Sequence, residues 1–119
     1  KTANREALLL MLYAGAVRFL KQAIEATEKK DNPEKYRLIG RTQEIINELR
    51  ATLNFEVGGD IAATLESLYD FITDRLLLGN REPDPKPLVE ALNVLTTLHT
   101  AWEQAIESLK KEKNSTAQP

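Results

Sequence analysis

The spacing of apolar side chains along the chain predicts four long amphipathic helices. In residues 4–31, apolar positions recur every three or four residues, as they do on one face of a helix. Asn4 is a suitable cap for this helix, and the charged stretch 28–31 marks its expected end. Asn32 and Pro33 then supply the start of a second helix over 33–54. Its apolar stripe consists of Ile39, Thr42, Ile46, Leu49 and Leu53.

Two further helices follow a break at residues 58–59, where two glycines interrupt the pattern. Asp60 is placed to cap a helix that ends near Asn80. A proline-rich turn at 82–87 precedes the last helix, which is expected to end at Lys113. The stripes of these helices are Ile61, Leu65, Leu68, Tyr69, Ile72 and Leu76, and then Leu88, Leu92, Leu95, Leu98, Trp102, Ile106 and Leu109. Trp102 continues its stripe without a break, so we assign it to the core.

This pattern predicts an all-α fold, an antiparallel up-and-down four-helix bundle. The connections between the four helices are short, and short connections favour antiparallel neighbours. A chain of 119 residues is the usual size of one domain, which we expect to span residues 1–113. The polar residues 114–119 are expected to form a disordered tail.

Composition excludes several classes of function. Sixteen Lys and Arg face eighteen Asp and Glu, so the chain lacks the basic excess that nucleic-acid binding requires. The absence of cysteine rules out disulfides and thiolate metal sites and fits a reducing cytoplasm. The longest apolar run, residues 7–17, is shorter than the ~20 residues that span a membrane, so no membrane insertion is expected.

No motif in the sequence indicates catalysis. A Gly-rich phosphate loop, a nucleophile elbow and a His-Glu-x-x-His pair are all missing. The Asp and Glu residues fall on the polar faces of the predicted helices, where they serve solvation. We therefore expect a protein that is not an enzyme and that needs no cofactor.

One pair of residues leaves an alternative open. Met11 on the first helix and His99 on the last could be the axial ligands of a haem held inside a four-helix bundle. At 1.5 Å per residue, the two side chains match poorly in height along antiparallel helices. This alternative function is a haem-binding electron carrier.

The first helix carries more apolar surface than a bundle helix needs. Two adjoining stripes cover most of its circumference, so either it is the most buried helix or part of its surface binds another molecule. Apolar residues beside the core stripes of the next two helices would complete grooves for an amphipathic helix, or for a second copy of the chain. The candidate client-binding residues are Leu10, Met11, Leu38, Ile45, Phe71 and Leu78.

Four segments, one on each predicted helix, resemble a known family. The stretch LLLMLYAGA at 8–16 resembles the signature of the flagellin export chaperones, the FliS family. IINEL at 45–49, LYDF at 68–71 and AW at 101–102 are similar to its later helices and occur in the same order. Ala14 is a departure, because the family usually has an aspartate there.

The resemblance implies a cytoplasmic export chaperone. Such a protein binds the C-terminal segment of newly made flagellin, prevents premature polymerisation and aids flagellar type III secretion. A disordered client can wrap a large apolar surface reversibly without ATP, which fits the absence of a nucleotide motif. The flagellar export apparatus and a co-chaperone are further candidate partners.

Overall fold

The computed structural model describes residues 2–117 and the side chains of residues 5–114. Every regular element in the described part is helical, which confirms the all-α class. The elements in order are α1 (Thr2–Glu28), α2 (Asn32–Ala51), α3 (Phe55–Gly58), α4 (Asp60–Arg81) and α5 (Lys86–Ala117).

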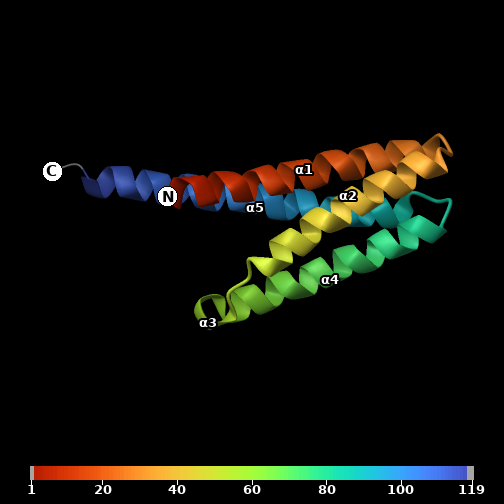
Figure 1. Cartoon of the computed structure of the whole chain (residues 1–119). Helices are drawn as coiled ribbons and strands as arrows, with labels where there is room; N and C mark the ends of the chain where they lie inside the picture. Colours follow the sequence, from red (N-terminus) through yellow and green to blue (C-terminus); the bar gives the residue numbers. More distant parts are fainter. Residues whose placement is uncertain (1, 118–119) are drawn as a thin grey trace.

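The four long helices run alternately in opposite directions, as Figure 1 shows. Helix α1 packs along α2 and α5, and α4 packs along the same two helices. Among the described helices, no Cα atoms of α1 and α4, or of α2 and α5, lie within 8 Å, so these pairs are diagonal. The turns at 29–31 and 82–85 lie at one end, the closed end, and α3 lies at the other, the open end.

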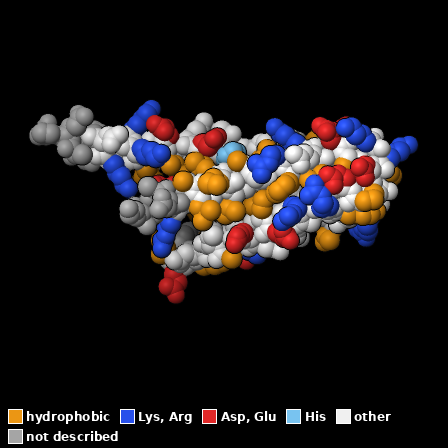
Figure 2. Space-filling model, turned by 45° about the horizontal axis from the view of Figure 1, so that its top comes forward, with side chains coloured by type: hydrophobic (Ala, Val, Ile, Leu, Met, Phe, Trp, Pro, Cys, Tyr) orange, Lys and Arg blue, Asp and Glu red, His pale blue; other side chains and the backbone are white. Residues whose placement is uncertain are grey.

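The core lies between the four long helices and follows the predicted stripes most closely on α2. Ile39, Thr42, Ile46 and Leu49 are all buried, as predicted, whereas Leu53, the last residue of that stripe, is half-buried because α2 ends at Ala51 and not at residue 54. The other helices contribute Tyr13, Ala16, Leu20 and Ala23 from α1, Tyr69, Ile72 and Leu76 from α4, and Leu88, Ala91 and Leu95 from α5. On the face seen in Figure 2, the remaining hydrophobic side chains form a band along the molecule, bordered by charged ones.

The helix starts differ from the prediction in three places. Helix α1 begins at Thr2, so Asn4 lies within it and does not precede it. The cap of α2 is Asp31, not Asn32, because the Asp31 carboxylate accepts a hydrogen bond from the Glu34 amide at 3.3 Å. Asp60 is the first residue of α4 and caps nothing, since Gly59 precedes the helix with a left-handed φ of 49°. Glycine adopts that φ without the steric cost that a side chain would add.

A one-turn helix, α3, was not predicted. The side chain of Asn54 accepts hydrogen bonds from the amides of Glu56 and Val57, at 3.1 and 3.2 Å, and so starts a new turn where α2 stops. This turn carries the apolar side chain of Val57 out to the open end.

The prediction of a disordered tail from residue 114 is not confirmed, since α5 continues to Ala117. The sequence holds no glycine or proline between Pro87 and Pro119, so nothing in it stops the helix at Lys113. Residues 118 and 119 lie outside the described residues.

The closed end is held by a buried lysine and a close helix contact. Lys35 is buried, and its ammonium group donates a 3.0 Å hydrogen bond from α2 to the carbonyl of Glu82, just after α4. Gly79 lies so close to Leu88 that a Cβ atom would come within 2.3 Å of the leucine side chain. The bond from Lys35 therefore links the α1–α2 hairpin to the α4–α5 hairpin at this end.

Helix α1 is apolar enough over Arg5–Glu28 to span a membrane by length and composition alone. In this structure its buried residues, Tyr13 and Leu20 among them, pack against the other helices of the bundle. The core helix of a soluble protein has the same composition, so this feature is weak evidence of a membrane span.

Candidate functional site

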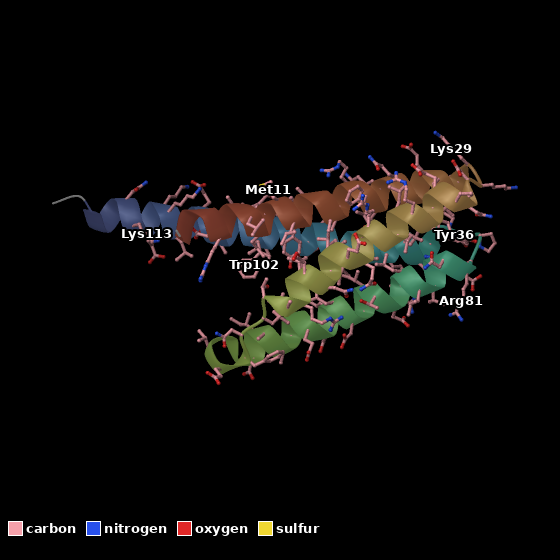
Figure 3. The ribbon with its side chains drawn as sticks, viewed as in Figure 1. Met11, Lys29, Tyr36, Arg81, Trp102 and Lys113 are labelled. Atoms are coloured by element: carbon pink, nitrogen blue, oxygen red, sulfur yellow. The ribbon has the colours of Figure 1, made fainter. Side chains whose placement is uncertain are left out.

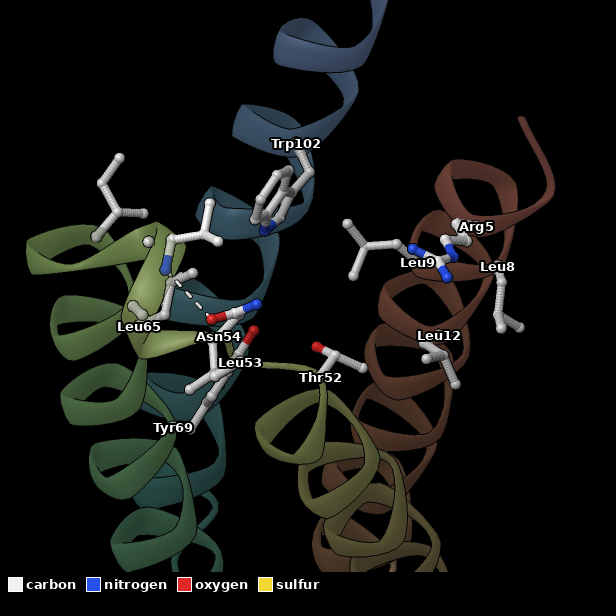
Figure 4. A pocket seen from close by; sticks show the side chains of 14 residues that line it. Arg5, Leu8, Leu9, Leu12, Thr52, Leu53, Asn54, Leu65, Tyr69 and Trp102 are labelled. Carbon is white, nitrogen blue, oxygen red and sulfur yellow. Dashed lines mark hydrogen bonds between the residues drawn. The ribbon is translucent and has the colours of Figure 1, made fainter. Parts of the chain in front are cut away.

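At the open end the helix pair α1 and α5 separates from α2 and α4, and an apolar pocket of about 650 Å³ lies between them. Figure 4 shows the side chains that line it. Apolar residues come from α1, α3, α4, α5 and the segment that follows α2, namely Leu8, Leu9, Leu12, Leu53, Val57, Ile61, Ala62, Leu65 and Trp102. Pockets of this size and lining suit the apolar face of a peptide helix.

The polar groups of the pocket are few. Arg5 is the one charged residue among those that line it, and Thr52, Asn54 and Tyr69 are its uncharged polar members. Asn54 is occupied in capping α3. Binding in this pocket would therefore rest mainly on the removal of apolar surface from water.

A pair of tyrosines lies at the base of the pocket. The hydroxyl oxygens of Tyr13 on α1 and Tyr69 on α4 are 2.5 Å apart and hydrogen-bonded. Burial raises the pKa of both hydroxyls, so both remain protonated at neutral pH. The ring of His99 stacks on Tyr13 with a centroid distance of 6.1 Å.

Trp102 is the element of the pocket that differs most from its sequence assignment. The structure places it half-buried, packed against the core on one side and lining the pocket on the other. In Figure 3 it points from α5 into the opening between the two helix pairs. The assignment of Trp102 to the core is therefore only half correct.

The six predicted client-binding residues do not come together, and none of them lines the pocket. Met11 is 69% exposed and Phe71 is also exposed, whereas Leu10 and Leu78 are half-buried. Leu38 is 1% exposed and belongs to the core, so it offers no surface to a client in this structure. Ile45 packs toward α1, where its Cδ1 atom would be 3.3 Å from a Cβ atom at Gly15.

The pair required for haem ligation is not assembled either. Met11 is exposed on the outer side of α1, so its sulfur does not face the bundle interior. His99 instead stacks on Tyr13 and lies 3.7 Å from the carboxylate of Glu103. In the part of the chain that the structure describes, no group of three His, Asp or Glu side chains is placed to hold a metal ion.

Sequence reasoning missed the pocket because it treated the open end as continuous core. The signal that could have found it is the break after Leu53, where Asn54 begins a new turn and Val57 and Ile61 flank the two glycines. Apolar residues beside a chain break have no neighbour guaranteed by helix periodicity. Ile61, expected in a core stripe, is 68% exposed.

The fold and pocket define a small helical protein with an apolar pocket at one end of the bundle. A sequence model of the family described as "Flagellar protein FliS" matches residues 1–109 of the chain. The chain therefore belongs to the FliS family.

Individual relatives agree with this assignment. The "Flagellar secretion chaperone FliS" of Bacillus subtilis is 34% identical over 113 residues, which cover 95% of this chain and 84% of the relative. The protein of the same name from Vibrio cholerae is 34% identical over 86% of this chain and 75% of its own length. The "Flagellar secretion chaperone FliSB" of Pseudomonas aeruginosa is 36% identical over 85% of this chain and 80% of its own length.

Proposed function

We propose that this protein is a cytoplasmic export chaperone that binds the C-terminal segment of flagellin in the apolar pocket at the open end of the bundle. The observation that carries the proposal is the pocket itself, an apolar site of about 650 Å³ in a member of a family of flagellar secretion chaperones. Capture of this segment would prevent premature polymerisation and keep flagellin available for type III secretion. No catalytic step is part of this function.

The architecture that we propose for this role is an antiparallel up-and-down four-helix bundle, fixed at its closed end. A client helix would lie between α1 and α4 and cover Leu9, Leu12 and Leu65. Ordering of a disordered client offsets part of the binding free energy, so the complex would be reversible.

Two of the predicted client-binding residues keep a role in this proposal. Met11 and Phe71 are exposed apolar side chains outside the pocket, and an extended client could cover them after leaving it. The export apparatus or a co-chaperone would be further partners for such surface.

The test is calorimetry of the C-terminal segment of flagellin from the same organism against two variants of α4. Ile61→Asp places a carboxylate at the pocket and should weaken binding at least about tenfold. Leu77→Asp is the matched control, because Leu77 is 58% exposed on the same helix and lies outside the pocket. It should bind as the wild type does.

Circular dichroism should show both variants folded, since both side chains are exposed. The proposal fails if the wild-type protein does not bind the segment. It also fails if Ile61→Asp and Leu77→Asp bind it with equal affinity, because the pocket would then have no special part in capture.

A further inference from the structure

The hydroxyl pair at the base of the pocket joins two helices that do not otherwise touch. Tyr13 belongs to α1 and Tyr69 to α4, which are diagonal in the bundle. The two side chains are 0% and 2% exposed, and their oxygens are 2.5 Å apart. Tyr69 lines the pocket and projects from α4 into the space between the helices (Figure 4).

The pair has one more hydrogen-bond donor than it uses. Each hydroxyl carries one O–H group, and the bond between them consumes only one of the two. Trp102, which interacts with Tyr13, offers only an indole N–H, which is a donor and cannot accept a proton. Among the described residues, the second O–H has no acceptor.

This count does not depend on the direction of the bond. If Tyr13 donates to Tyr69, the Tyr69 proton is left over, and in the reverse case the Tyr13 proton is left over. Because burial raises the pKa of both tyrosines, neither loses its proton near neutral pH to remove the surplus.

A surplus donor beside an open pocket affects what can bind there. Water that enters the pocket can accept the proton, whereas an apolar side chain that displaces the water cannot. A buried donor without an acceptor is costly, and this cost falls on any occupant that is apolar throughout. An occupant that supplies an oxygen acceptor avoids it.

We propose that the segment held in the pocket places a hydrogen-bond acceptor against the hydroxyl pair of Tyr13 and Tyr69, and that this contact selects it from other apolar segments. The inference rests on the proposed function and adds the chemistry of the client. The acceptor is a side-chain amide, hydroxyl or carboxylate oxygen, or a carbonyl in the last turn of the client helix, where carbonyls have no partner within the helix. A segment of the same shape without it should bind about tenfold more weakly.

The test compares the flagellin C-terminal segment on three proteins by calorimetry. The double variant Y13F/Y69F removes both hydroxyls and keeps both rings, so its fold should be nearly as stable as that of the wild type. Tyr36→Phe is the matched control, because Tyr36 is exposed on α2 and lies outside the pocket. The double variant should bind about tenfold more weakly, and the control should bind normally.

Equal or tighter binding by the double variant would overturn the inference, since a purely apolar occupant gains when the surplus donor is removed. That result would leave the proposed function standing. A wild-type protein that does not bind the segment would remove both the proposed function and this inference.

A measurement on the wild-type protein keeps the inference testable if the double variant does not fold. In the complex, proton magnetic resonance should show two downfield hydroxyl signals from this pair, one for the mutual bond and one for the bond to the client. A complex with a single such signal would show that the client supplies no acceptor.

Discussion

At the closed end of the bundle Leu38 and Leu88 have almost no exposed surface, whereas at the open end most of the surface of Ile61 and Val57 is exposed. The side chains are of the same kind, so hydrophobicity does not explain the difference. At the closed end two short turns and the bond from Lys35 to the carbonyl of Glu82 hold both hairpins together. At the open end the chain connection through α3 joins α2 to α4, which belong to the same helix pair.

Under the proposed function, this difference would let one bundle be both a stable fold and a binding site. Apolar surface that the closed end buries within the chain contributes to folding, while similar surface at the open end would remain for a partner. The ion pair of Arg50 and Asp70, 2.6 Å long, links α2 to α4 on the way to the pocket, and the hydrogen bond between Tyr13 and Tyr69 links α1 to α4 at the same level.

Substitution of an apolar residue by aspartate at each end should give the largest difference in the free energy of unfolding. Leu38→Asp would bury a carboxylate without a partner and should lower the free energy of unfolding by more than about 4 kcal/mol. Ile61→Asp should change it by less than about 1 kcal/mol, because the site is exposed and a carboxylate is favourable in the first turn of α4. Urea unfolding followed by circular dichroism measures both, and similar losses would contradict the comparison.

Substitution of either of two glycines by alanine should give a difference in stability of intermediate size. Gly79→Ala would push a methyl group into Leu88 and should destabilise the closed end by about 1–3 kcal/mol. Gly40→Ala is the control on α2, where a Cβ atom would meet nothing within 4 Å, and it should stabilise the protein by up to about 1 kcal/mol. Thermal melting should move in opposite directions, and a stabilised Gly79→Ala protein would show that the contact is loose.

The tyrosine pair gives no pH effect near neutrality, and its effect is seen only at high pH. The pKa values of Tyr13 and Tyr69 are raised above 10.0, so both hydroxyls stay protonated in the folded state when they ionise in the unfolded chain. Their contribution is full below about pH 10 and is lost as pH rises toward the folded pKa values. The loss should be up to about 1.4 kcal/mol per pH unit for each tyrosine.

Urea unfolding at about pH 9 and about pH 11 should therefore show a steeper loss for the wild type than for Y13F/Y69F. Parallel losses in the two proteins would mean that the pair does not keep its protons on folding.

The comparison also explains what the sequence could predict. The stripe of α2 was predicted correctly as far as Leu49, because Ile39, Ile46 and Leu49 recur with helical period and neighbouring helices cover that face. Periodicity identifies the apolar face of a helix but not whether another helix reaches it. Ile61 and Trp102 continue their stripes into the open end, where the helix pairs separate, and so the same reasoning placed them in the core.

The predicted client-binding residues are scattered over the structure for a related reason. Leu38 and Ile45 lie beside the apolar stripe of α2. Side chains in such positions are exposed only where the neighbouring helix does not reach them. Gly15 lets α2 approach α1 closely, which brings Ile45 into that interface. Whether a residue beside a stripe is buried depends on how several helices pack together. The apolar stripe of a single helix does not contain this information.

The bond between Tyr13 and Tyr69 also bears on the order in which the protein assembles. These residues are 56 positions apart, whereas α1 with α2 and α4 with α5 form hairpins between neighbours in the chain. Local hairpins can form early, but a contact across the diagonal needs both hairpins to have docked. The contact between Tyr13 and Tyr69 lies at the base of the pocket. We therefore expect a chain with only one hairpin formed to have no complete pocket. A nascent chaperone would then acquire its client only when its own folding is finished.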